Sequence, residues 1–353
     1  EVGSPAAGAL GIEGPVIDVA VTPDRADCLS VRGIARDLAA AGIGRLKPLV
    51  AEPVPAAGAA GPAIRLDFTA ETARACPLFV GRLIRGVRNG PRPAWMQERL
   101  KAIGLRPISA LVDITNYVTF DLGRPLHVFD ADRLDGDIVL RLARPGETLH
   151  ALDGKTYELS PAMTAIADAS GPVSLGGIMG GETTGVSEAT IDVLLEVALF
   201  DPIRTGMTGR ALGIDSDART RFERGLDTGF VLAGTEIATR LILDLCGGEA
   251  APAVVAGEPP PGPASIRFRK ASLPKLAGVD LEVPAIERIL ADLGFALEGG
   301  PDVWTVTPPT WRHDVTTEAC IVEELARVHG YDNIEPVAVI RGGAVGSGVL
   351  PSE

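Results

Sequence analysis

Two stretches rich in proline, glycine and alanine, residues 48–63 and 247–264, interrupt this chain and constrain how it can fold. Both contain few large apolar side chains, and proline and glycine break helices and strands, so we expect the two stretches to be linkers. A chain of 353 residues ordinarily forms two or three domains. The linkers therefore predict one domain at 64–246 and a smaller one at 265–337, followed by a Gly- and Ser-rich tail at 338–353.

The charge balance limits the partners that the chain can bind. The 33 Lys and Arg residues face 46 Asp and Glu residues, which gives a net charge of −13. This excludes a globally basic surface, so any contact with RNA has to be local, and DNA is not an expected partner. No run approaches the ~18 to 20 apolar residues of a membrane span, and the first ten residues do not resemble a secretory leader. We expect a soluble, cytoplasmic chain with no membrane contact.

The four cysteines are widely spaced and form no C-x-x-C pair. Neither a zinc knuckle nor a disulfide framework is therefore indicated, and we expect reduced, mostly packed thiols.

Residues 1–47 are too short to form a domain of their own. A strand is predicted at 15–21, and a helix is predicted to begin at Asp27, as its N-cap, and to end at Gly42. One strand and one helix cannot bury a core, so this piece is expected to pack on another part or to belong to a domain that has been cut through. The chain begins at Glu1 without a methionine, which indicates a piece of a larger protein.

The two expected domains both mix strands with helices, which predicts an α+β or mixed α/β multidomain fold. Because the order is not a clean βαβ repeat, a doubly wound parallel sheet is not expected. Strands are predicted at 78–84, 138–142, 164–167, 191–197, 265–268 and 303–307, and helices at 95–103, 106–119, 229–245, 284–293 and 317–328. The last block has the size and element order of a small winged-helix-like domain.

The densest glycine cluster lies at 176–182, where the sequence reads GGIMGGE. Glycine lets a ligand approach the backbone closely, so a binding wall of peptide N–H groups is one interpretation. A tight β-turn in a hairpin is an equally good one. A phosphate-binding loop is not indicated, because neither the G-K-[ST] ending nor the G-x-G-x-x-G spacing is present.

Four further residues carry candidate site chemistry. Thr115 and Asn116 near the end of a predicted helix, followed by His127 in a loop, place neutral donors and an imidazole near one site if the loop folds back. The commoner interpretation of a lone histidine in such a loop is a structural, hydrogen-bonded one. Glu196 lies inside the apolar run LLEVALF, where a carboxylate is costly unless it is paired. It is either a buried structural acid or a group that selects a ligand.

Two basic stretches are candidate RNA contacts. The stretch 82–106 has only one acid, and its arginines Arg82, Arg85, Arg88 and Arg92 are expected to lie along a phosphate backbone. The arginines at 204–224 form either an RNA-facing strip or an alternating-charge, solvated helix face.

Three carboxylates in the last block, Asp314, Glu323 and Glu324, offer oxygen ligands of the kind that Mg²⁺ prefers. Acidic residues early in a helix are more commonly partners of the helix dipole, so the sequence alone favours that interpretation.

These segments together resemble the beta subunits of bacterial phenylalanine–tRNA ligases. The resemblance is carried by a series of separate motifs in matching order: TPDRADCLSVRGIARDLA, RPISALVDITNYVTFDLGRPLHVFD, LGGIMGGE, LLEVALFDP, SDARTRFERGLD, PPTWRHD and EELARVHGYDNI. It implies that 1–47 is a remnant of the first core domain, that 64–246 is a tRNA-editing domain and that 265–337 is the winged-helix-like domain after it.

The same resemblance implies an activity and its residues. In that family the middle domain hydrolyses tyrosine wrongly attached to phenylalanine tRNA, while ATP is used for aminoacylation by the parent enzyme, whose alpha subunit holds the synthetic site in an assembly of two alpha and two beta subunits. The implied editing pocket comprises Thr115, Asn116, His127, Gly180, Gly181, Glu196, Ser216 and Ala218. His127 and Asn116 are expected to position the attacking water, and Glu196 with a backbone N–H near Gly180 to hold the tyrosine hydroxyl. The general base stays open between His127 and a ribose hydroxyl of the tRNA.

The family also carries Mg²⁺ sites, shared with the alpha subunit, onto Asp314, Glu323 and Glu324. A fourth, usually acidic position falls on Cys320, which is a poor ligand for a hard cation. We therefore expect this chain to bind Mg²⁺ only when the alpha subunit is present.

Two other functions compete with editing. In the first, the pocket is a relic, and the chain only binds tRNA and docks the alpha subunit. In the second, the winged-helix-like domain binds nucleic acid by itself. The intact polar set Asn116, His127 and Glu196 favours an active hydrolase, and the net charge argues against a stand-alone nucleic-acid-binding protein.

Overall fold

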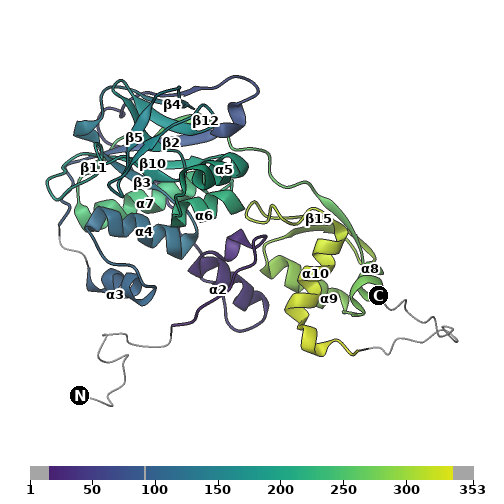
Figure 1. Cartoon of the computed structure of the whole chain (residues 1–353). Coiled ribbons are helices and arrows are strands. Elements are labelled where there is room, and N and C mark those ends of the chain that lie inside the picture. Colours follow the sequence, from purple (N-terminus) through teal and green to yellow (C-terminus); the bar gives the residue numbers. More distant parts are fainter. Residues whose placement is uncertain (1–15, 91–92, 337–353) are drawn as a thin grey trace, which may run out of the picture.

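The computed structural model describes residues 16–90 and 93–336, and its central domain is built on two packed sheets (Figure 1). The first sheet has the strand order β1-β4-β7-β8-β9 and is antiparallel except for the parallel pair β1 and β4. Its strands are β1 (Ile64–Asp67), β4 (Ile138–Leu142), β7 (Thr164–Asp168), β8 (Gly171–Leu175) and β9 (Met179–Gly180). The predicted mixture of strands and helices is therefore confirmed, and the fold is α+β.

The second sheet is antiparallel and has the order β11-β2-β10-β3, with β12 also paired to β2. Its strands are β2 (Leu78–Arg85), β3 (His127–Asp130), β10 (Val193–Leu199), β11 (Glu249–Ala250) and β12 (Val254–Gly257). Every residue of β10 is buried, because the two sheets pack against each other on one side of this strand and helices cover the other side.

Those helices are α4 (Ala110–Leu122) and α7 (Val231–Cys246), whose apolar faces share a core with β2 and β10. The Ser109 side chain caps α4 by accepting from the amide of Val112, and the helix ends at Gly123, whose φ of 72° is left-handed. This ending turns the chain directly into β3 and so places His127 at the start of a sheet strand.

Four smaller elements surround the two sheets. They are helix α3 (Ala94–Ala102), the hairpin of β5 (Thr148–His150) and β6 (Thr156–Glu158), and helices α5 (Pro202–Leu212) and α6 (Asp217–Arg224). Short 3-10 turns lie at Ala73–Ala75 and Ala131–Arg133.

The last domain has a three-stranded antiparallel sheet of order β13-β15-β14, packed on three helices. Its elements are β13 (Ile266–Arg269), α8 (Ser272–Ala277), α9 (Val283–Asp292), β14 (Ala296–Gly299), β15 (Val303–Thr307) and α10 (Glu318–His329), followed by a 3-10 turn at Tyr331–Asn333. Phe268 and Trp304 stack in its core, with ring centroids 5.6 Å apart. The expected tail at 338–353 lies outside the described residues.

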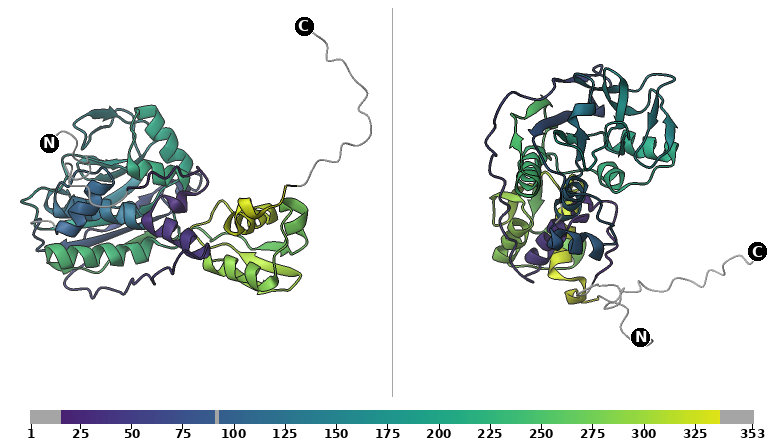
Figure 2. Two further views of the ribbon diagram at one scale, coloured as in Figure 1. Left: turned by 90° about the horizontal axis from the view of Figure 1, so that it is seen from below. Right: turned by 90° about the vertical axis from the view of Figure 1, so that its left-hand side faces the viewer.

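The helix of the segment before the first expected linker lies between the two domains, as Figure 1 and the left view of Figure 2 show. Helix α2 (Val31–Ala40) contacts α4 of the central domain and α9 of the last one. Two of the expected features are wrong: no strand forms at 16–21, and Ser30, rather than Asp27, caps the helix after a 3-10 turn at Ala26–Cys28. Asp27 instead pairs with Arg25 and Arg36, which removes its carboxylate from the capping position.

The expected linkers are more structured than their composition indicates. Residues 247–264 supply β11 and β12, which pair with β2, and Val54 in the first stretch is buried in the core of the central domain. The pairing partner of these segments lies far away in the sequence, so local composition carries no information about it. No helix among the described residues has the length and apolar character to cross a membrane.

Candidate active site

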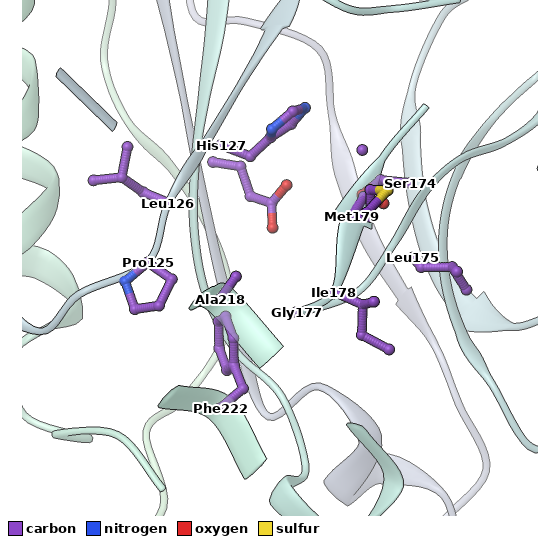
Figure 3. A pocket seen from close by; sticks show the side chains of 12 residues that line it. Pro125, Leu126, His127, Ser174, Leu175, Gly177, Ile178, Met179, Ala218 and Phe222 are labelled. Atoms are coloured by element: carbon purple, nitrogen blue, oxygen red, sulfur yellow. The ribbon is translucent and has the colours of Figure 1, made fainter. Parts of the chain in front are cut away.

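A small cavity of about 80 Å³ opens between the two sheets of the central domain, beside α6. Figure 3 shows Pro125, Leu126 and His127 on one side of it, Met179 and Ser174 on the other, and Ala218 with Phe222 at its base. Glu196, Gly177, Ile178, Leu175 and Gly180 complete the lining. Four of the residues expected in the pocket, His127, Gly180, Glu196 and Ala218, therefore meet around one cavity.

Glu196 and His127 form the polar centre of this cavity. They are direct partners in the antiparallel pairing of β10 with β3, so their side chains lie on the same face of the sheet, toward the other sheet. Glu196 is 6% exposed, and its Oε2 atom and the Nε2 atom of His127 are both buried with no hydrogen-bond partner among the described residues. Two unpartnered polar atoms at one spot are a costly arrangement that a ligand with a polar group would relieve.

Burial shifts both ionisations toward the neutral forms. It raises the pKa of Glu196 to about 8 and lowers the pKa of His127 to about 4. Near pH 7 the site thus holds a protonated carboxyl, which both donates and accepts a hydrogen bond, beside a neutral imidazole. Such a pair recognises an uncharged polar group better than an ion.

The glycine cluster serves both of its alternative interpretations at once. Residues 176–178 form the turn of the hairpin between β8 and β9, in which Ser174 pairs with Gly180, and the same hairpin is a wall of the cavity. A Cβ atom on Gly180 would lie 2.5 Å from Cε1 and 2.7 Å from Nε2 of His127. Only glycine at this position leaves the imidazole its place.

Ser216 and Gly181 support the cavity without being among the residues that line it. Ser216 caps α6 by accepting from the amide of Arg219, and its Oγ donates to the carbonyl of Ile178, 2.9 Å away. This hydrogen bond fastens α6 to the glycine hairpin. The amide of Gly181 donates to the carbonyl of Val173 within the strand pairing.

The other two expected pocket residues do not reach this cavity. Thr115 and Asn116 lie on α4 and are not among the residues that line it, and the Thr115 hydroxyl donates to the carbonyl of Val112 in its own helix. Their proximity in sequence to the His127 loop indicated a shared site, but α4 packs with α7 in the core beside the second sheet.

The expected RNA-contacting arginines divide by burial. Arg82 is 2% exposed, and its guanidinium donates to the carbonyls of Val54 and Ala251 and pairs with Glu236, so the expectation that it contacts RNA is wrong. Arg85 donates to the carbonyl of Ala59, whereas Arg88 is exposed. Arg92 lies outside the described residues.

The arginines of α6 likewise make contacts within the molecule. Arg219 pairs with Glu223, Arg221 donates to the carbonyl of Leu29, and Arg224 donates to that of Val21. Arg221 and Arg224 fasten the amino-terminal segment to the central domain, so neither an RNA-facing strip nor a fully solvated face describes the arginines of α6.

The expected Mg²⁺ ligands do not fit the ion in this arrangement. The Arg312 guanidinium binds both Asp314 and Glu324, at 2.7 Å in each case, and Arg327 binds Glu324 as well. Burial alone would raise the pKa of Glu324, but hydrogen bonds from Arg312 and Arg327 hold it at about 2. Because a guanidinium already neutralises these two acids, they offer no free ligand pair.

The third expected ligand, Glu323, and the neighbouring Cys320 give no site either. Glu323 is exposed, and the Cys320 sulfur contacts the hydroxyl of Thr317. Among the described residues, the sole cluster with metal-ligand spacing is Asp27, Cys28 and Asp37, and Arg25 donates to all three.

No sequence pattern singled out a second polar pair near the cavity. His150, at the end of β5, pairs with Glu182 at 2.6 Å between Nε2 and Oε2, just beyond Gly180. Glu182 belongs to the glycine motif, but its partner lies 32 positions earlier in the chain, where nothing local marks it.

Comparison with known proteins identifies the domains and the relatives of this chain. The model of the B3/4 domain matches residues 75–247, and that of the tRNA synthetase B5 domain matches residues 266–331. Phenylalanine–tRNA ligase beta subunits from Paramagnetospirillum magneticum and Rhodospirillum rubrum are 58% and 52% identical over 320 and 342 residues. These alignments cover 91% and 96% of this chain but 40% and 43% of the relatives. The chain thus spans about two fifths of the relatives' length.

Among solved structures, an N-terminal fragment of the phenylalanyl-tRNA synthetase beta subunit from Pyrococcus horikoshii aligns with a TM-score of 0.45 at 16% identity, over 88% of this chain and 86% of that one. This likeness is too weak to define the fold by itself. The domain matches and the close relatives do define the family, and the chain belongs to the phenylalanine–tRNA ligase beta subunits.

Proposed function

We propose that the central domain hydrolyses the ester of tyrosine wrongly attached to phenylalanine tRNA. The observation that carries this proposal is the neutral, unpartnered pair of Glu196 and His127 in a cavity that is otherwise largely apolar. A tyrosyl ring that enters the cavity brings its hydroxyl to these two groups. The protonated Glu196 carboxyl and the His127 imidazole then each gain the hydrogen bond that they lack.

Selectivity follows from the cost of leaving those groups unpaired. Phenylalanine has the same shape but no hydroxyl, so it displaces water from Glu196 and His127 and offers nothing in return. A site built to bind a hydroxyl in this way discriminates by ~10⁴ to 10⁵ against the analogue that lacks it. His127 is the direct cross-strand partner of Glu196, which favours hydroxyl binding over water positioning as its role.

The partners of the whole protein are proposals of the same kind. We propose that the chain acts in the cytoplasm as part of a ligase with an alpha subunit and phenylalanine tRNA, and that ATP and Mg²⁺ serve the synthetic reaction elsewhere in that assembly. In this proposal, the residues that carry out editing all lie in this chain.

A deacylation assay on the assembled ligase tests the proposal. Tyrosyl-tRNA is expected to be hydrolysed far faster than phenylalanyl-tRNA, and Glu196→Ala is expected to abolish this difference. Equal rates on both substrates by the unmodified protein would show that the cavity does not select tyrosine, and no hydrolysis of either substrate would leave a non-catalytic, tRNA-binding role.

A further inference from the structure

A short ribbon extends from the cavity toward solvent. Residues 150–152 run antiparallel to residues 180–182: the Leu152 amide donates to the Gly180 carbonyl at 3.0 Å, and the Glu182 amide donates to the His150 carbonyl at 2.9 Å. Residues directly opposite in such a pair have side chains on the same face, and alternate residues of one strand share a face. Leu152, His150 and Glu182 therefore share the face of Gly180.

That face is the one turned toward the cavity. The Cβ direction of Gly180 points at the His127 ring, and the same position lies 3.2 Å from Cδ1 of Leu152. Exposure rises along the ribbon, since Gly180 is buried whereas the side chains of His150 and Glu182 are 49% and 57% exposed. The His150–Glu182 pair thus lies at the outer end of the wall on which His127 packs.

The pair has the arrangement of a base and its orienting acid. Glu182 holds the Nε2 side of the ring at 2.6 Å, and Nδ1 contacts the hydroxyl of Thr156 at 3.2 Å, a contact that a water molecule can replace. Leu152, which is 52% exposed, lies directly opposite Gly180 on the same face as this pair and offers an apolar surface to a substrate leaving the cavity.

The spacing along the ribbon matches the substrate. Two residues of a strand span ~6.8 Å, which is comparable to the length of a tyrosyl group from its hydroxyl to its carbonyl carbon. A tyrosine whose hydroxyl contacts Glu196 and His127, and whose backbone extends along this ribbon, places its ester near the His150–Glu182 pair.

We propose that His150, oriented by Glu182, is the general base of the deacylation, an inference that rests on the proposed function. A water molecule attacks the ester carbonyl carbon while His150 Nδ1 takes its proton, and Glu182 stabilises the imidazolium. The bond between that carbon and the ribose oxygen then breaks, and the proton passes from Nδ1 to the ribose oxygen. The products are free tyrosine and intact tRNA, with no other reactant consumed.

Steady-state deacylation of tyrosyl-tRNA by the assembled ligase tests this role. His150→Gln is expected to lower kcat by ~100-fold or more with KM unchanged, as for the loss of a general base, and to remove one ionisation from the pH–rate profile. Glu182→Gln is expected to act in the same direction, and the double variant is expected to be no slower than His150→Gln, because the two residues work as a unit. His329→Gln, the same change on α10, is the matched control and is expected to leave kcat unchanged.

Each outcome decides between the proposals. Unchanged kcat in His150→Gln, with activity still lost in Glu196→Ala, overturns the base but leaves editing in place. A raised KM with unchanged kcat reduces His150 to a binding contact and also overturns the base. An unmodified ligase that does not hydrolyse tyrosyl-tRNA overturns both. Because His150 is half exposed, its variant is expected to keep the Tm of the unmodified protein, which separates lost chemistry from lost folding.

Discussion

His127 and Glu196 face each other across neighbouring strands, and each keeps one buried polar atom that no described residue hydrogen-bonds. Buried polar groups in folded proteins are ordinarily paired, so an unpaired couple at one point indicates a ligand site. The unpartnered atoms of His127 and Glu196 add no hydrogen bond that would stabilise their strands. Recognition of a ligand is therefore the better explanation for both residues.

Replacing Glu196 with glutamine is expected to change how stability depends on pH. Its pKa is about 8 in the folded protein against an ordinary 4.5, so the folded state holds a proton that the unfolded state releases. The contribution to stability is therefore complete below pH 4.5 and is lost as the pH rises through 8, at about 1.4 kcal/mol for each unit of pKa difference. Glu196→Gln is expected to gain stability relative to the unmodified chain over this range in urea unfolding. The same change at the exposed Glu188 serves as the control, and parallel pH curves for all three proteins would contradict a protonated Glu196.

Adding one methyl group at Gly180 is expected to damage the site. In Gly180→Ala the new Cβ would overlap the His127 ring at 2.5 Å, so the ring or the hairpin has to move, at a cost of about 1 to 3 kcal/mol. We expect a lower free energy of unfolding and a loss of tyrosyl-tRNA deacylation. Gly44→Ala, where a Cβ meets open space, is the control. A Gly180→Ala protein with full activity would show that His127 does not need its present position.

Removing Arg312 is expected to destabilise the last domain. Arg312 and Glu324 are each 3% exposed, so Arg312→Gln leaves a buried carboxylate with Arg327 as its remaining partner, at a cost of about 3 kcal/mol. The depressed pKa of Glu324 means that its contribution is present above pH 4.5 and is lost as the pH falls toward 2. Breaking the exposed pair of Arg288 and Asp292 with Arg288→Gln is expected to cost under about 0.5 kcal/mol. Equal losses in urea unfolding would refute the difference in burial as the cause.

Replacing Arg82 and replacing Arg88 are expected to have different effects on tRNA binding. Arg88→Ala removes an exposed charge, so it should lower the slope of log affinity against log salt by about 0.7 to 0.9 if Arg88 contacts a phosphate. Arg82→Ala should leave that slope unchanged and instead lower the free energy of unfolding by about 1 to 3 kcal/mol, because Glu236 and two carbonyl groups lose their partner. Binding measured from 50 to 200 mM salt separates the two effects. A reduced slope in Arg82→Ala would place that residue on the RNA after all.

Magnesium is expected to find no site at Asp314 and Glu324 in this chain. Arg312 holds both carboxylates. Titration calorimetry with Mg²⁺ is therefore expected to give the same result for the unmodified chain and for Asp314→Asn. Cys320→Asp places a further carboxylate beside Asp314, and we expect that variant also to show no Mg²⁺ binding because Arg312 is still in place. Binding by Cys320→Asp would show that the cysteine, rather than the arginine, excludes the ion.

The sequence by itself determined about half of the described helices and strands. Apolar periodicity placed β4 and β15 at their observed bounds, and it placed α7 and α9 within two residues of them. These features depend on side chains a few positions apart, and that is information that a local pattern carries.

The motifs also identified the family and four members of the cavity, His127, Gly180, Glu196 and Ala218, by resemblance. Why those four belong together is not a local property. Glu196 meets His127 because β10 pairs with β3 in one register, and Gly180 meets His127 because the two sheets pack face to face.

Only the tertiary structure decided where the charges lie. Arg82 and Arg88 have the same chemistry in one basic stretch, yet the segments around Val54 and Ala251 cover the first, whereas the second lies beyond the end of β2 and is exposed. Asp314 and Glu324 look like metal ligands until Arg312 is seen between them, and His150 has no local mark until Glu182 is seen beside it. Burial and pairing between residues far apart in the chain set these outcomes, because they depend on which surfaces meet when the domains pack.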